Sequence, residues 1–296
     1  MQTLPVDVLL PQLLQSLAHC SNAVLQAPPG AGKTTRVPLA LLDPDWLGGR
    51  KILLLEPRRL AARTAARYMA RSLGERVGAT VGYRVRLDSR VGPGTRIEVV
   101  TEGVLTRLLQ ADPALEQVGL VVFDEFHERS LQADTGLALC LDSQSALRED
   151  LRILVMSATL DGAAVARLLG DAPLLTSAGR SYPVAMHYRP PVTPRTPAGQ
   201  LSYESVVRVV QEALREESGS VLVFLPGTGE IRRLEAALQT AGLAPDVRVV
   251  PLYGQLDARA QDAAIQPPPA GIRKVVLATA IAETSLTIEG IRVVID

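Results

Sequence analysis

The fold is decided by the stretch Ala23-Val24-Leu25-Gln26-Ala27-Pro28-Pro29-Gly30-Ala31-Gly32-Lys33-Thr34-Thr35. The apolar residues before Pro28 predict a β-strand, and the residues from Thr34 onward predict the start of a helix. Glycines between a strand and a helix let successive backbone N–H groups converge on an anion, and the helix N-terminus adds its dipole. The residues predicted to bind nucleotide phosphates are Gly30, Ala31, Gly32, Lys33, Thr34 and Thr35.

Lys33 is one of only three lysines in the chain, beside Lys51 and Lys274, so an incidental lysine in a Gly/Pro turn is the less favoured interpretation. Its ammonium would supply a catalytic point charge for the β- and γ-phosphates, and the Thr34 hydroxyl would ligate Mg²⁺. The loop predicts ATP binding but does not specify a reaction.

A second motif begins where the apolar run 120–123 meets Asp124-Glu125-Phe126-His127-Glu128-Arg129. In a phosphate-loop protein, Asp124 would hold Mg²⁺ through water, and Glu125 would polarise the attacking water as general base. The alternative is that these carboxylates only start the next helix, where the dipole favours them. His127 is too isolated to ligate a metal and is predicted to link the nucleotide site to a partner site.

Ser157-Ala158-Thr159 follows the apolar run 153–156. The hydroxyls of Ser157 and Thr159 are predicted to hydrogen-bond toward the acidic cluster and couple it to the state of the γ-phosphate. A helix N-cap is the ordinary alternative for such a tripeptide.

Short apolar runs alternate with amphipathic, helix-length segments along the whole chain, which predicts α/β units with parallel sheets covered on both faces by helices. The rhythm breaks near residue 180, and the Pro-rich residues 190–197 are predicted to form a loop. We therefore expect a first domain over residues 1–180 and a second over residues 181–296. The expected strands are 23–26, 52–55, 82–86, 97–100, 120–123, 153–156, 221–225, 248–250, 274–278 and 291–295, and the expected helices are 59–73, 131–146, 163–169, 203–217, 230–241 and 258–265.

Composition excludes several classes of protein. The 296 residues suit two domains, and 47% hydrophobic with 21% charged residues is ordinary for a globular chain. No apolar run approaches the 18 to 20 residues of a membrane span, and the N-terminus lacks the features of a signal peptide. Two cysteines and three histidines exclude a disulfide framework and disfavour structural zinc. A cytoplasmic protein without membrane contact is expected.

The formal net charge of +0 hides two opposed regions. Residues 50–90 contain eleven basic and three acidic side chains, a balance of +8, whereas residues 112–171 contain four basic and eleven acidic ones, a balance of −7. The basic region suits a phosphate backbone, although arginines at helical spacing also suit a solvated helix face.

The order of motifs resembles that of superfamily 2 helicases of the DEAH-box class, and the Asp-Glu-Phe-His sequence is similar to the bacterial HrpB-type branch. The phosphate loop resembles motif I, residues 56–63 motif Ia, residues 101–105 motif Ib, residues 124–129 motif II and residues 157–159 motif III. Residues 222–227 resemble motif IV and residues 279–288 motif V.

This resemblance implies two tandem RecA-like domains, the second incomplete, that form an ATP-dependent helicase core. Such a core hydrolyses ATP with Mg²⁺ and binds single-stranded RNA or DNA to translocate or unwind, and a monomer is expected. Glu289 is carried over as a nucleotide-binding residue. The candidate nucleic-acid contacts are Arg58, Arg59, Arg84, Thr101, Gly227 and Thr279.

The chain also departs from the pattern. Tyr68 and Ile265 stand where relatives place the arginine and the aromatic residue that stack on adenine, which predicts weak base selectivity. The arginines of motif VI are absent, so we expect an N-terminal fragment with slow ATP hydrolysis. Two other functions stay open: a nucleotide-gated nucleic-acid-binding module that does not unwind, and, less favoured, a phosphate-loop metabolic kinase.

Overall fold

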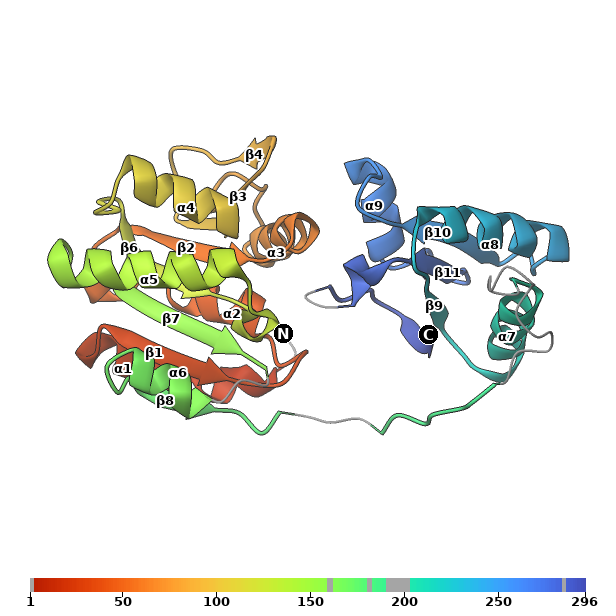
Figure 1. Cartoon of the computed structure of the whole chain (residues 1–296), viewed down its shortest axis with the longest axis horizontal. Coiled ribbons are helices and arrows are strands. Elements are labelled where there is room, and N and C mark those ends of the chain that lie inside the picture. Colours follow the sequence, from red (N-terminus) through yellow and green to blue (C-terminus); the bar gives the residue numbers. More distant parts are fainter. Residues whose placement is uncertain (1–2, 159–161, 180–182, 190–202, 284–285) are drawn as a thin grey trace. The chain divides into compact units, whose positions relative to one another are not determined.

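The computed structural model of the chain describes residues 3–158, 162–179, 183–189, 203–283 and 286–296. Its contacts divide the chain into two compact units, Met1–Tyr182 and Pro183–Asp296. Each unit is an α/β assembly built around a sheet of its own (Figure 1).

Unit 1 is built on an eight-stranded sheet in which all neighbours are parallel except the antiparallel pair β3 and β4. The inner strands are buried along their length, and all six residues of Val118–Phe123 are inaccessible to solvent. In spatial order, the strands are β4 (Asp88–Arg90), β3 (Val81–Val85), β5 (Ile97–Thr101), β2 (Lys51–Glu56), β6 (Val118–Phe123), β7 (Arg152–Ser157), β1 (Asn22–Gln26) and β8 (Leu174–Thr176).

Helices cover both faces of this sheet, because successive strand side chains point to opposite sides. One face packs Leu25, Leu54 and Leu154 against apolar side chains of α1, α2 and α3. The other face packs Val24 and Phe123 against α4, α5 and α6. The helices are η1 (Pro5–Val8), α1 (Leu10–His19), α2 (Lys33–Ala40), η2 (Asp45–Leu47), α3 (Arg59–Ser72), α4 (Glu102–Ala111), η3 (Phe126–Glu128), α5 (Leu131–Ala146) and α6 (Gly162–Leu168).

Unit 2 has a four-stranded parallel sheet in the order β10 (Val247–Leu252), β11 (Arg273–Ala278), β9 (Ser220–Phe224), β12 (Ile291–Ile295). Its core packs Val223 and Leu277 of the sheet against Val210 and Leu234 of two helices. The helices of this unit are α7 (Tyr203–Glu216), α8 (Thr228–Ala241), α9 (Ala258–Ile265) and the short η4 (Ala280–Ala282).

The predicted fold class, with parallel sheets between helices, is confirmed, and the predicted strands and helices are present with ends that differ by at most two residues. The sequence expectation missed the short strands β4 and β8 and the helices α1 and α4. The Pro-rich residues 190–197 lie outside the described residues, as does Thr159. Among the helices that the structure describes, none has both the length and the apolar character needed to span a bilayer.

Candidate active site

The residues singled out in the first half of the sequence meet at one edge of the unit 1 sheet. Parallel strands all end at the same edge, and the adjacent strands β5, β2, β6, β7 and β1 end there in that order. From one side to the other, this carboxyl edge carries Thr101, Glu56, Asp124, Ser157 and the loop after Gln26.

The phosphate loop follows β1 and leads into α2. Gly30 and Gly32 both have positive φ, 75° and 92°, a conformation that side chains with a Cβ rarely adopt. Lys33 is only 4% exposed, and its ammonium donates to the carbonyl oxygens of Ala27 and Pro28 at 2.6 and 3.2 Å. An ammonium has three protons, so this arrangement leaves one for a phosphate oxygen.

One contact joins the loop to the acidic strand end. The Thr34 hydroxyl donates to Oδ2 of Asp124 at 2.5 Å, across 90 residues of sequence. Because β7 lies between β1 and β6 in the sheet, this contact spans the end of an intervening strand. The fold thereby brings the two predicted Mg²⁺ ligands to the same point.

Four carboxylates crowd this point: Glu56, Asp124, Glu125 and Glu128. Burial raises the pKa of Glu56 well above its usual range, and the neighbouring Asp124 carboxylate raises it further. Burial is also the main cause that raises the pKa of Asp124, although its hydrogen bond from Thr34 acts in the opposite direction. Burial followed by the charge of Asp124 raises the pKa of Glu125 to about 7. Crowded acidic groups of this kind are relieved by a cation.

The donor set at this point fits Mg²⁺. Oε2 of Glu56 is buried and has no hydrogen-bond partner among the residues that the structure describes. Over the same residues, no three His, Cys, Asp or Glu side chains are placed to hold a metal ion by themselves. Mg²⁺ is usually bound through one or two carboxylates together with substrate phosphates and water, so Thr34 and Asp124 are a suitable protein share.

The backbone after β6 is strained where it carries Glu125. Glu125 and Arg129 have positive φ values of 47° and 45°, which non-glycine residues adopt at a cost. The Glu125 amide donates to Oδ1 of Asp124 at 2.9 Å. Phe126 holds the turn in place, because its ring is 5% exposed and packs edge-on against Phe123 with ring centroids 6.0 Å apart.

His127 contacts two of the predicted functional segments. Its Nδ1 lies 3.4 Å from Oε2 of Glu125 and accepts from the Ala158 amide at 3.4 Å. Burial lowers the pKa of His127, which favours the neutral ring that can accept at Nδ1. Ser157 is buried, and its carbonyl accepts from the Ala27 amide at 3.0 Å, so the third motif also adjoins the phosphate loop.

The predicted nucleic-acid contacts of unit 1 lie on three neighbouring strands of the same edge. Arg58 is the N-cap residue of α3 and Thr101 that of α4, and the strand residues Glu56 and Thr101 are register partners. Arg84 lies in β3 opposite Val100, one strand further along. Two helix N-termini therefore adjoin side chains that bind phosphate, and the exposed Arg59 begins α3.

In unit 2, Gly227 precedes α8 and Thr279 precedes η4, and these turns follow the adjacent strands β9 and β11. Glu289 is exposed, just before β12. The two residues at the expected adenine positions differ in exposure: Tyr68 of α3 is 48% exposed, whereas Ile265 of α9 is 7% exposed.

Two features of the site were missed by sequence reasoning. Glu56 reaches Asp124, and the signal that could have found it was a glutamate at the end of an otherwise apolar strand. Leu4–Val8 supports the phosphate loop: the Val6 amide donates to the Ala31 carbonyl at 3.1 Å, and Leu4 packs over the Cα of Gly32. No motif announces the second contact.

Comparisons with known proteins agree with this geometry. The sequence model of the DEAD/DEAH box helicase family matches residues 9–168, and that of the helicase conserved C-terminal domain matches residues 204–296. The ATP-dependent RNA helicase HrpB of Escherichia coli strain K12 is 55% identical over 296 residues, covering 100% of this chain and 36% of that protein. The ATP-dependent RNA helicase HrpA of the same strain is 36% identical, covering 99% of this chain and 22% of that protein.

Solved structures give the same result. A crystal structure of the Escherichia coli DEAH/RHA helicase HrpB matches with a TM-score of 0.87 at 55% identity, covering 98% of this chain and 36% of that one. The chain therefore spans about a third of the length of its HrpB relatives.

Proposed function

Because the chain belongs to the DEAD/DEAH box helicase family, we propose that it binds ATP with Mg²⁺ at the carboxyl edge of the unit 1 sheet and hydrolyses it in response to single-stranded nucleic acid. The observation that carries the proposal is the hydrogen bond from Thr34 to Asp124, which joins the phosphate loop to the acidic strand end. Use of this hydrolysis to translocate on or unwind RNA or DNA belongs to the same proposal.

Each side chain has a separate task in this proposal. The loop amides and Lys33 bind the β- and γ-phosphates, and Thr34 with Asp124 holds Mg²⁺, which when bound neutralises charge on the phosphates. Glu125 accepts the proton of the attacking water, a task that suits a carboxylate whose pKa is raised to about 7. His127 and Ser157 connect the nucleotide to the rest of the carboxyl edge.

Nucleic acid would run along the same edge beside the nucleotide. Arg58, Arg59, Arg84 and Thr101 suit the sugar–phosphate backbone, because guanidinium groups bind phosphates bidentately and helix N-termini attract anions. Such contacts set position without reading sequence. Gly227 and Thr279 would add contacts from unit 2. Two free cysteines, Cys20 and Cys140, fit a reducing, cytoplasmic location.

The proposal is tested by separating ATP binding from ATP hydrolysis. We expect Lys33→Ala to weaken binding of a fluorescent ATP analogue with Mg²⁺ at least tenfold, because a buried charge for the phosphates is lost. We expect Glu125→Gln to retain binding but to lower phosphate release by about 100-fold or more, because only the proton acceptor is removed.

Glu149→Gln is the matched control, since Glu149 is an exposed carboxylate near the opposite edge of the sheet. It should leave both measurements unchanged. If Lys33→Ala and Glu125→Gln bind and turn over ATP like the control, the site is wrongly assigned. If ATP is hydrolysed but neither single-stranded RNA nor DNA changes the rate, the nucleic-acid part of the proposal is wrong.

A further inference from the structure

The five residues after Glu125 reach the predicted nucleic-acid edge, and we infer that Glu128 is a positioning residue that holds Arg58 until a backbone phosphate replaces it. The inference rests on the proposed function and extends it. It assigns to residues 126–130, which no motif role covers beyond His127, the task of reporting occupancy of the nucleic-acid edge to Glu125.

The first contact joins motif II to motif Ia. Oε2 of Glu128 lies 3.5 Å from Nη2 of Arg58, and both side chains are partly exposed, at 19% and 30%. A phosphate that approaches the N-terminus of α3 therefore meets an arginine already engaged by a carboxylate. Phosphate and carboxylate compete for the same guanidinium face, so nucleic acid has to displace Glu128 to gain the full contact.

The second contact joins the same segment to motif Ib. The Ser130 hydroxyl donates to Oε2 of Glu102 at 2.8 Å and accepts from the Ala133 amide at 2.9 Å as the N-cap of α5. Glu102 is the first residue of α4 and directly follows Thr101. The segment after motif II thus contacts the first turn of α4 as well as Arg58 at the start of α3.

The segment also has little freedom to move without moving Glu125. The Glu128 amide donates to the Glu125 carbonyl at 2.9 Å, which closes a single 3₁₀ turn. Phe126 anchors that turn in the core, and Glu125 and Arg129 have positive φ at its two ends. A displacement of Glu128 is therefore transmitted to Glu125 over three residues of constrained backbone.

The test measures binding of a fluorescein-labelled single-stranded oligouridine in the absence of nucleotide. Glu128→Gln keeps the size of the side chain but removes its charge, and we expect about three- to tenfold tighter binding because Arg58 is released. Misfolding would weaken binding, so a gain cannot arise from structural damage. Arg58→Ala should weaken binding and reduce its salt dependence by about one phosphate contact.

The double variant shows whether Glu128 acts through Arg58. In the Arg58→Ala background, Glu128→Gln should leave affinity unchanged, because the partner of the carboxylate is already gone. Asp134→Asn is the matched control, since Asp134 of α5 forms a comparable ion pair with Arg129 at 2.7 Å and should not alter binding.

A second measurement follows ATP turnover with and without the oligonucleotide. We expect the ratio of the two rates to fall severalfold in Glu128→Gln relative to wild type, because the segment no longer distinguishes free from occupied Arg58. Unchanged affinity, an equal gain in the Arg58→Ala background, or an unchanged rate ratio would each overturn the inference. If the wild-type chain neither binds the oligonucleotide nor hydrolyses ATP, the proposed function itself fails.

Discussion

The two edges of the unit 1 sheet use charged residues in opposite ways. At the carboxyl edge, Glu56, Asp124 and Glu125 lie together, and burial with mutual repulsion raises the pKa of each. At the amino edge, Arg148 and Arg50 both bind Asp150, and their hydrogen bonds hold the pKa of that carboxyl well below its usual range.

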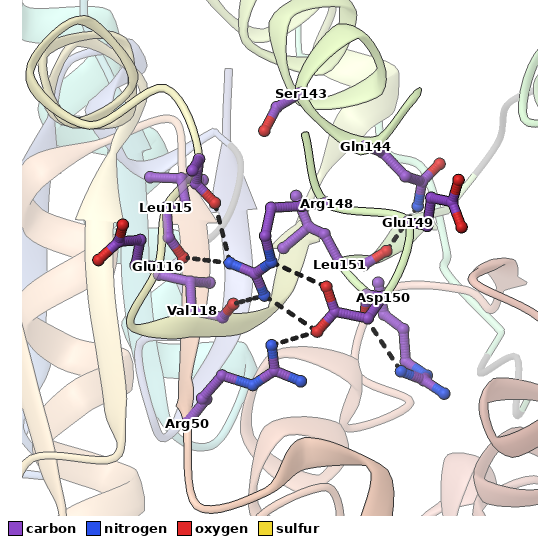
Figure 2. Close-up of polar contacts among 12 residues, drawn as sticks. Arg50, Leu115, Glu116, Val118, Ser143, Gln144, Arg148, Glu149, Asp150 and Leu151 are labelled. Carbon is purple, nitrogen blue, oxygen red and sulfur yellow. Dashed lines mark hydrogen bonds and ion pairs between the residues drawn. The ribbon is translucent and has the colours of Figure 1, made fainter. Parts of the chain in front are cut away.

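The network at the amino edge is a local clamp on three strands (Figure 2). The Arg148 guanidinium donates to the carbonyls of Ala114, Leu115 and Val118 at 2.9 to 3.1 Å, and also to Asp150. Asp150 in turn accepts from Arg50. The starts of β2, β6 and β7 are thereby tied together by donors that all have acceptors.

The difference teaches what each edge is for. Opposite charges with complete hydrogen bonding stabilise the native state, whereas like charges gathered in a buried site destabilise it until a ligand supplies the missing charge. Residues arranged for function commonly reduce stability in this way. If this interpretation is right, neutralising a charge should have opposite effects at the two edges.

The largest effect is expected from Arg148→Ala. The change leaves three backbone carbonyls without their donor and should lower the free energy of unfolding by about 2–4 kcal/mol, because uncompensated buried polar groups are costly. Urea denaturation followed by circular dichroism measures it. The exposed Arg167→Ala on α6 is the control and should change stability by less than about 0.5 kcal/mol. Equal effects of the two variants would remove the amino edge from the comparison.

An intermediate effect of opposite sign is expected from Glu56→Gln. The amide relieves the crowding around Asp124 and should raise the free energy of unfolding by about 1–2 kcal/mol in EDTA. Glu98→Gln is the matched control, because Glu98 is equally buried but pairs with Arg84 at 2.6 Å and Lys51 at 3.7 Å. The control should destabilise by about 1–2 kcal/mol, since two cations lose their partner. Destabilisation by both variants would contradict the interpretation of the carboxyl edge.

The smallest effect is expected from Asp150→Asn and depends on pH. A carboxyl whose pKa is lowered in the folded state stabilises the protein above its unfolded pKa of about 4, and this contribution is lost as pH falls toward the folded value. Because Asp150 is half exposed, solvent limits the loss at pH 7 to about 1 kcal/mol or less. Denaturation at pH 7 and pH 3 should show the difference from wild type shrinking in acid; a constant difference would show that the ion pairs do not stabilise the edge.

Much of the fold could be predicted because its signals are local. The glycines of the phosphate loop, the carboxylates that end the run 120–123 and the apolar runs themselves each lie within a few residues of chain. The strand and helix positions they predict are confirmed. The residue roles carried over from the DEAH-box resemblance remain predictions, and the structure adds that those in unit 1 lie along one sheet edge.

Other features could not be predicted because they depend on which strands become neighbours. Glu56 meets Asp124 only because β2 lies beside β6, and Arg58 meets Glu128 across 70 residues for the same reason. Phe126, which resembles a mere variation of the family motif, is the ring that anchors the strained turn against Phe123. Leu4–Val8 supports the phosphate loop through packing and one backbone hydrogen bond, which no residue pattern announces.

The sequence by itself determined that this protein has a phosphate loop, an acidic strand end and parallel α/β units, because backbone conformation and apolar periodicity are properties of short segments. Only the tertiary structure decided that Glu56 joins the acidic cluster, that Glu128 engages Arg58 and that the opposite edge is clamped by Arg148 and Asp150. These contacts follow from the lateral order of the strands, which packing of the whole domain selects and which no single segment encodes.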